Sequence, residues 1–124
     1  MLTDQEIQQA INIISKNPNN LHEHPDCVRI AYAWLDAQKK IQNTCSKLYP
    51  IKHYIEKWAG RYVSENDVEV AAYLHPEIKG KYPKFNISSN LTEPRRSRLI
   101  GIPEAMTQLN YHSNHDPKKY KIHE

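Results

Sequence analysis

Apolar residues recur every three or four positions through the first 76 residues, which is the spacing of amphipathic helices. The first such stretch predicts a helix over residues 4–16, and Thr3 with Glu6 forms a capping box at its start. A second and longer stretch begins at Pro25, whose fixed φ suits the first turn of a helix, and continues to Cys45. We therefore expect residues 25–45 to form the longest helix and the centre of the core.

Two shorter helices follow and are joined at Gly60. Residues 51–59 form the first, and Gly60 can take the left-handed conformation that commonly ends a helix. Ser64 and Asp67 predict a new N-terminal cap, and the second short helix then continues until Pro76. The two helices together have the outline of a helix-turn-helix, a motif with which many regulators read DNA.

The charges of the second short helix argue against base reading. Its first turns carry Glu65, Asp67 and Glu69, which would face the phosphates of a DNA duplex. A helix pair within a bundle is the simpler interpretation, because acidic residues suit the positive end of a helix. A DNA-binding regulator is kept as the alternative. Its base-reading side chains would be Arg61, Ser64 and Asn66.

Helical periodicity fades after Pro76, where glycines and prolines divide residues 80–103 into short pieces. We expect a short strand within residues 82–87, a helix after Thr92 and another over residues 103–109. The composition from Ser113 onward is typical of unstructured chain. The predicted fold is all-α, with four to six helices that include the helix-turn-helix-like pair and an irregular basic C-terminal half. Residues 1–112 form a single helical domain and residues 113–124 a polar basic tail.

Length and charge narrow the class of protein. A chain of 124 residues is long enough to bury the core of one domain. The net charge of +3 is uneven: residues 1–78 have a net charge of −2, and residues 79–124 have +5. No apolar run is long enough to cross a membrane, and the first residues lack the basic start and apolar stretch of a signal peptide. We expect a cytoplasmic protein without membrane contact.

Basic and aromatic side chains alternate in the positively charged half. Lysines interleaved with rings are typical of surfaces that bind single-stranded nucleic acid, whereas tyrosine and arginine are common anchors of protein interfaces. A plainer interpretation places the rings in the core and the arginines against the acidic half. The predicted partner-binding residues are Lys79, Lys81, Tyr82, Lys84, Phe85, Arg95, Arg96 and Arg98.

Seven histidines raise the question of a metal site. One cluster precedes the second helix and another lies near the C-terminal end, and neither has the ligand spacing of a standard zinc site. We expect no bound metal and no cofactor. The residues that would have to serve as ligands are His22, His24, Cys27, His112 and His115.

One set of residues has the composition of a hydrolytic site. Asp26, Glu77 and Lys79 have the residue types of the carboxylate pair and lysine in metal-dependent nucleases. Such groups normally stand on adjacent strands, whereas here they belong to a helix start and to a segment after a proline. None of the three glycines belongs to a nucleophile or phosphate-binding motif. We expect no enzymatic activity, with a nuclease as the second alternative.

Two remaining patterns have simple interpretations. Cys27 and Cys45 would lie about 27 Å apart on one continuous helix, which is too far for a disulfide. Asn86 and Asn90 each begin a glycosylation sequon. We interpret both sequons as coincidences in a polar loop, because no secretion signal is evident.

Two segments carry a resemblance: residues 24–39, HPDCVRIAYAWLDAQK, and residues 75–83, HPEIKGKYP. In these segments the chain resembles the small accessory proteins encoded by temperate phages and prophages of enteric bacteria. The resemblance implies a non-enzymatic protein that regulates phage genes or blocks host nucleases, polymerases or defence systems. We therefore predict a binding protein that acts stoichiometrically on a host protein through its basic aromatic C-terminal half, with nucleic acid as the rival partner.

Overall fold

The computed structural model describes residues 1–14, 23–44 and 50–124. The helices in these ranges are α1 (Asp4–Ile14), α2 (Pro25–Ala37), α3 (Ile51–Ala59), α4 (Glu65–Leu74) and α5 (Leu109–His112), with 3-10 helices η1 (Arg96–Leu99) and η2 (Pro117–Lys119). The strands are β1 (Gly80–Lys81), β2 (Lys84–Phe85), β3 (Thr92–Glu93) and β4 (Ile122–His123). β1 and β2 form an antiparallel hairpin, and β3 pairs with β4 in parallel. The molecule is thus rich in helix, as predicted, but it is not all-α.

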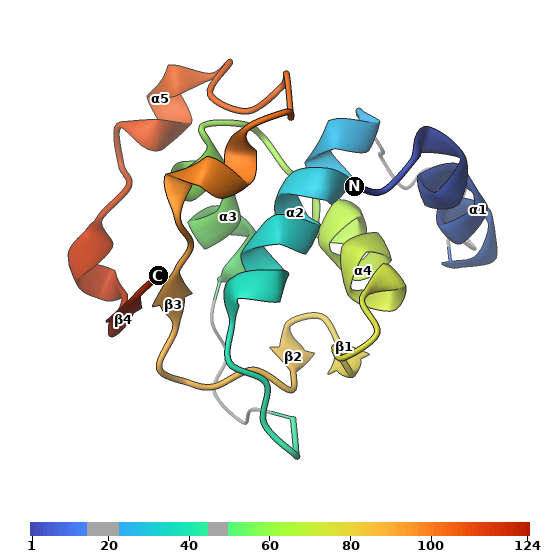
Figure 1. Cartoon of the computed structure of the whole chain (residues 1–124), viewed down its shortest axis with the longest axis horizontal. Helices are drawn as coiled ribbons and strands as arrows, with labels where there is room; N and C mark the ends of the chain where they lie inside the picture. Colours follow the sequence, from blue (N-terminus) through green and yellow to red (C-terminus); the bar gives the residue numbers. More distant parts are fainter. Residues whose placement is uncertain (15–22, 45–49) are drawn as a thin grey trace.

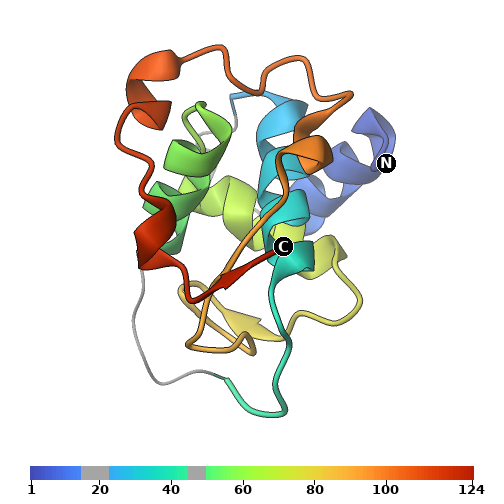
Figure 2. The same cartoon turned by 60° about the vertical axis from the view of Figure 1, so that its left-hand side comes forward.

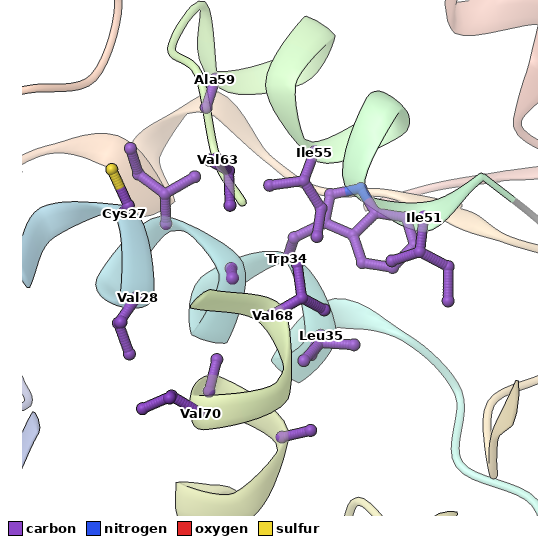
Figure 3. Close-up of a cluster of buried hydrophobic side chains, with 14 of the residues drawn as sticks. Cys27, Val28, Trp34, Leu35, Ile51, Ile55, Ala59, Val63, Val68 and Val70 are labelled. Carbon is purple, nitrogen blue, oxygen red and sulfur yellow. The ribbon is translucent and has the colours of Figure 1, made fainter. Parts of the chain in front are cut away.

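Helix α2 lies at the centre of the molecule, between α3 on one side and α4 and α1 on the other (Figure 1). Its buried residues include Cys27, Ile30, Ala31, Trp34 and Leu35, which share one face at helical spacing. Figure 3 shows Trp34 and Leu35 of α2 among apolar side chains of α3 and α4, such as Ile55 and Val68. Each large apolar side chain that leaves water here contributes roughly 2 kcal/mol to stability. The amphipathic pattern of the sequence therefore identifies the core correctly.

The prediction of one helix over residues 25–45 is wrong, because α2 ends at Ala37. Gln38 takes an extended backbone, and its buried side chain donates to the carbonyl oxygens of Trp34, at 3.0 Å, and Thr92, at 2.8 Å. Its Oε1 accepts the backbone N–H of Thr92 at 2.9 Å. These bonds tie the end of α2 to β3. The distance of about 27 Å predicted between Cys27 and Cys45 assumed one continuous helix, so it no longer applies. Cys27 is a buried free thiol, and Cys45 lies outside the described residues.

The caps predicted for α3 and α4 are confirmed. Gly60 ends α3 in the left-handed conformation, with φ 60°. Ser64 and Asp67 form a reciprocal capping box at the start of α4. The two helices nevertheless do not make a helix-turn-helix, because each packs mainly elsewhere: α4 against α2 and α1, and α3 against α5 and α2. The short connection is a link between two sides of the core.

The last residues are ordered against the body of the domain, contrary to what their composition indicates. Tyr120 is buried, and its hydroxyl accepts a hydrogen bond from Trp34 Nε1 at 3.0 Å. β4 then pairs with β3, and the Glu124 carboxylate accepts from Arg98. Figure 2 shows this C-terminal strand crossing the front of the domain beside β3. Residues 113–124 therefore belong to the same packed unit as the helices.

The segment between the hairpin and the last strand contains less helix than predicted. The stretch after Thr92 forms β3 and only a short 3-10 helix, η1, while α5 begins at Leu109, where the second predicted helix was expected to end. Prolines at both ends of these pieces leave too few donors for longer helices. No helix in the described ranges is long and apolar enough to span a membrane.

Candidate partner-binding surface

The β1–β2 hairpin lies below α4 (Figure 1), and the predicted residues Lys79, Lys81 and Lys84, on it or just before it, are exposed. Gly80 faces Phe85 and Lys81 faces Lys84 across the two strands. Gly80 has φ +103°, and a Cβ added there would stand 2.3 Å from the carbonyl oxygen of Lys84. Only glycine fits so close to the opposite strand. Gly80 therefore fixes the local geometry of the hairpin, although the sequence indicated only that it interrupts a helix.

Asn86 holds the base of the hairpin to the rest of the domain. Its Oδ1 accepts the backbone N–H of Lys79 at 2.6 Å, while its Nδ2 donates to the carbonyl oxygens of Glu77 at 2.9 Å and Ile41 at 3.3 Å. The residue is 4% exposed, so it does not lie in the polar loop that the sequon suggested. Sequence reasoning missed this positioning role, because nothing in the residue type separates Asn86 from the exposed Asn90.

A pocket of about 620 Å³ lies between the hairpin and α4. Its walls include the apolar residues Ile14, Ala72, Ile78 and Phe85 together with the rings of Tyr73 and Tyr82. Phe85 is 1% exposed, so it forms the floor and is not itself available to a partner. The Tyr82 ring meets it edge-on, with 6.2 Å between ring centroids, and burial raises the pKa of the Tyr82 hydroxyl. Of the two predicted rings, only Tyr82 is therefore accessible.

The pocket rim carries charges of both signs. Lys79 and Lys81 line it from the hairpin, and Glu69 lines it from α4. Lys84 is exposed beside them on β2. Within the parts of the chain that the structure describes, none of the three lysine ammonium groups is held in an ion pair. A partner could therefore contact these lysines without displacing a carboxylate of the described residues.

The three predicted arginines lie at and just before η1 and not on the hairpin. Arg98 is bound by Glu124, at 2.6 Å, and by Asp36, at 2.9 Å. The Arg96 guanidinium donates to the Trp58 carbonyl oxygen and lies 5.8 Å from the Trp58 ring centroid. The predicted set therefore divides into two regions, and two of its arginines already have internal partners.

The residues predicted to read DNA are not displayed on a recognition helix. Arg61 is 3% exposed and donates to Glu104, at 3.1 and 3.2 Å, and to Glu23, at 3.3 Å. Ser64 is buried in the capping box, and Asn66 is half-buried and has a polar partner of its own. These contacts leave the Arg61 guanidinium directed at carboxylates inside the molecule.

The histidine clusters are separated and have structural partners. His24 caps α2, because its Nδ1 accepts the backbone N–H of Asp26 at 3.0 Å. Burial raises the pKa of the Cys27 thiol to about 12, which keeps it protonated at neutral pH. His112 stacks on His115 near α5, with 5.4 Å between ring centroids. His22 lies outside the described residues, and in the remainder no group of three such side chains is placed to hold a metal ion.

The residues of the nuclease hypothesis are not brought together. Asp26 begins α2, where it binds Arg29 at 2.7 Å and accepts the backbone N–H of Glu104 at 3.2 Å. Glu77 and Lys79 follow α4 near the opposite end of α2 (Figure 1). A single cation cannot contact carboxylates at both ends of the helix.

Comparison of the chain with protein-family models, with curated proteins and with solved structures finds no match. The candidate surface is therefore characterised by its own geometry: a hairpin fixed by Gly80 and Asn86, free lysines, and an apolar pocket beside them.

Proposed function

We propose that this chain is a non-enzymatic binding protein that acts stoichiometrically on a bacterial host protein in the cytoplasm, as the phage accessory proteins that it resembles do. The observation that carries the proposal is an apolar pocket beside α4 with exposed lysines next to it on the β1–β2 hairpin, which have no ion pair with any residue that the structure describes. Interfaces between proteins commonly combine a desolvated apolar centre with a polar rim. The hairpin surface has both parts within one small area.

A protein partner explains the mixture of charges better than nucleic acid does. Glu69 lines the same pocket as Lys79 and Lys81, and Glu65 is exposed one helical turn before it. A polyanion would meet these carboxylates together with the lysines, and each would offset part of the phosphate attraction. A protein surface can place a neutral or basic group against Glu69 and carboxylates against the lysines. The partner is therefore inferred to present carboxylates to the lysines and none to Glu69.

The rival hypothesis is a DNA-binding regulator that uses α4. It would require Arg61 to leave Glu104 and Glu23 before reaching a base, since its guanidinium is buried. Both carboxylates are partly exposed, so the cost is the loss of the hydrogen bonds to these two charged partners, each worth about 1.5–3 kcal/mol. That cost exceeds the roughly 1–3 kcal/mol of discrimination that a good base contact supplies. Inhibition of a host protein is accordingly preferred over DNA reading.

The test is affinity capture from a lysate of enteric bacteria, with and without nuclease treatment. Wild-type protein is compared with a variant that carries Lys79→Glu, Lys81→Glu and Lys84→Glu, and the captured proteins are quantified by mass spectrometry. We expect one host protein at a stoichiometry near one to one with the wild type and its loss with the hairpin variant.

A matched control reverses the same number of charges elsewhere. Lys118, Lys119 and Lys121 are exposed near the C-terminal end, far from the hairpin (Figure 1), and their replacement by Glu should leave capture unchanged. Capture that disappears on nuclease treatment would support the nucleic-acid rival instead. Equal loss with both variants would show a general charge effect and overturn the assignment of the surface.

A further inference from the structure

The pocket beside the hairpin also indicates what the partner presents. We propose that it receives one large apolar side chain from an acidic segment of the partner, while carboxylates of that segment bind Lys79 and Lys81. This inference rests on the proposed function, because it names the chemistry by which the partner protein is recognised. The occupant is an extended acidic peptide with an apolar anchor.

The size and lining of the pocket suit an anchor residue. Its volume of about 620 Å³ lies within the roughly 300–1,000 Å³ of pockets that enclose a small ligand. Phe85 and Ile78 provide an apolar floor, and Tyr73, which is 54% exposed, stands at the edge. A tyrosine ring at the rim can cover an inserted side chain without losing water from its hydroxyl. An inserted aromatic or large aliphatic group would therefore replace water against the apolar floor.

The positions of the lysines indicate that the residues flanking the anchor in the partner are acidic. Lys79 and Lys81 line the pocket from the hairpin, and Lys84 stands opposite Lys81 in the strand register. Carboxylates on either side of the anchor can reach these ammonium groups without displacing an internal partner. Glu69, on the α4 side, repels a carboxylate there and so directs the acidic residues toward the hairpin.

A second pocket also has basic residues in its wall, but these arginines are already bound by carboxylates of the chain. This pocket has a volume of about 550 Å³ and is lined by Arg29 and Arg98 near the N-terminus. Arg29 is bound by Asp26 and Asp4, and Arg98 by Asp36 and Glu124. An acidic ligand at that pocket would have to compete with carboxylates already in place. The hairpin pocket carries no such competition within the described residues.

The test is fluorescence anisotropy at low salt with a labelled peptide, Glu-Asp-Glu-Trp-Glu-Asp-Glu. We expect the wild type to bind it, and replacement of the peptide's Trp by Ala to weaken binding about tenfold, as loss of an interface anchor does. Tyr73→Ala and the double variant Lys79→Glu/Lys81→Glu should each weaken binding by a similar factor. Glu69→Gln should tighten binding about two- to threefold, because it removes the repulsion.

The control is Lys118→Glu/Lys119→Glu, which should bind the peptide like the wild type, with folding of every variant checked by circular dichroism. Equal binding of the Ala peptide, or of a Lys-Arg-Lys-Trp-Lys-Arg-Lys peptide, overturns the inference. A single-stranded dT dodecamer that displaces the acidic peptide at equal concentration overturns it in favour of nucleic acid. Failure of the peptide to bind, while the hairpin variant still abolishes capture of the host protein, refutes this inference alone. Failure of both refutes the proposed function too.

Discussion

Replacing Asn86 by alanine tests whether one buried side chain holds the base of the hairpin. The change removes three hydrogen bonds, to Lys79 N–H and to the carbonyl oxygens of Glu77 and Ile41. Each bond contributes about 1 kcal/mol net. Three such bonds give an expected loss near 3 kcal/mol. The midpoint of thermal unfolding should fall by roughly 10 °C.

Asn90→Ala is the matched control, since Asn90 begins the neighbouring sequon but is exposed. Its stability in urea should change by less than about 0.5 kcal/mol. Asn86→Asp tests the same bonds through pH. The Asp carboxylate cannot donate to either carbonyl oxygen, so the variant should be less stable than the wild type at neutral pH. This loss of stability should become smaller as the pH falls and the new carboxyl group is protonated. Equal stabilities of Asn86→Ala and Asn90→Ala would refute the reasoning.

Three further predictions concern the tail and the turn. Tyr120→Phe removes the acceptor of the buried Trp34 indole N–H and should cost about 1–3 kcal/mol in urea unfolding; a change below 0.5 kcal/mol would contradict it. Gly80→Ala forces a Cβ to within 2.3 Å of a carbonyl oxygen and should cost about 2 kcal/mol or more by the same assay, unless the hairpin is absent in solution. Hydrogen bonds from Arg98 lower the pKa of Glu124 to about 2, so its contribution is complete above pH of about 4.3 and is lost as pH falls toward 2. The full shift corresponds to about 3 kcal/mol of stability, and partial exposure of both side chains reduces this to about 1 kcal/mol. The difference in unfolding free energy between the wild type and Glu124→Gln should therefore disappear as the pH falls from about 4.3 to about 2. A difference that does not depend on pH would refute the ion pair.

Features set by neighbouring residues were predictable from the sequence. The capping box of Thr3 and Glu6 forms as expected, with the Glu6 N–H donating to Thr3 Oγ1 at 3.1 Å. Gly60 likewise ends α3 as its position predicts. Such contacts span three or four residues, so the spacing in the sequence already contains them.

Features set by distant residues were not predictable. Gln38 ends α2 through hydrogen bonds to Thr92, 54 positions away, although the apolar pattern alone continues past it. Tyr120 reaches Trp34 across 86 positions and orders a tail whose composition is typical of disorder. In both cases the stabilising hydrogen bond is made with a residue that comes close only when the whole domain has folded.

The candidate surface shows the same division. The lysines of the hairpin are exposed, because a polar turn rarely buries lysine, and their contact with a partner stays a prediction. The sequence could not indicate that Arg98 meets Asp36 and Glu124, since that contact requires the tail to be docked. It also gave no sign of the pocket beside α4, whose walls come from α1, α4 and the hairpin.

The central claim is that the hairpin and the adjacent edge of α4 form the contact surface for a protein. The most direct measurement is hydrogen–deuterium exchange of this chain, free and in complex with the host protein that it captures. We expect slowed amide exchange concentrated at residues 77–86 and around Tyr73, with the amides of residues 113–124 unchanged. Protection confined to the C-terminal residues or to the region around η1, with the hairpin amides unaffected, would contradict the account.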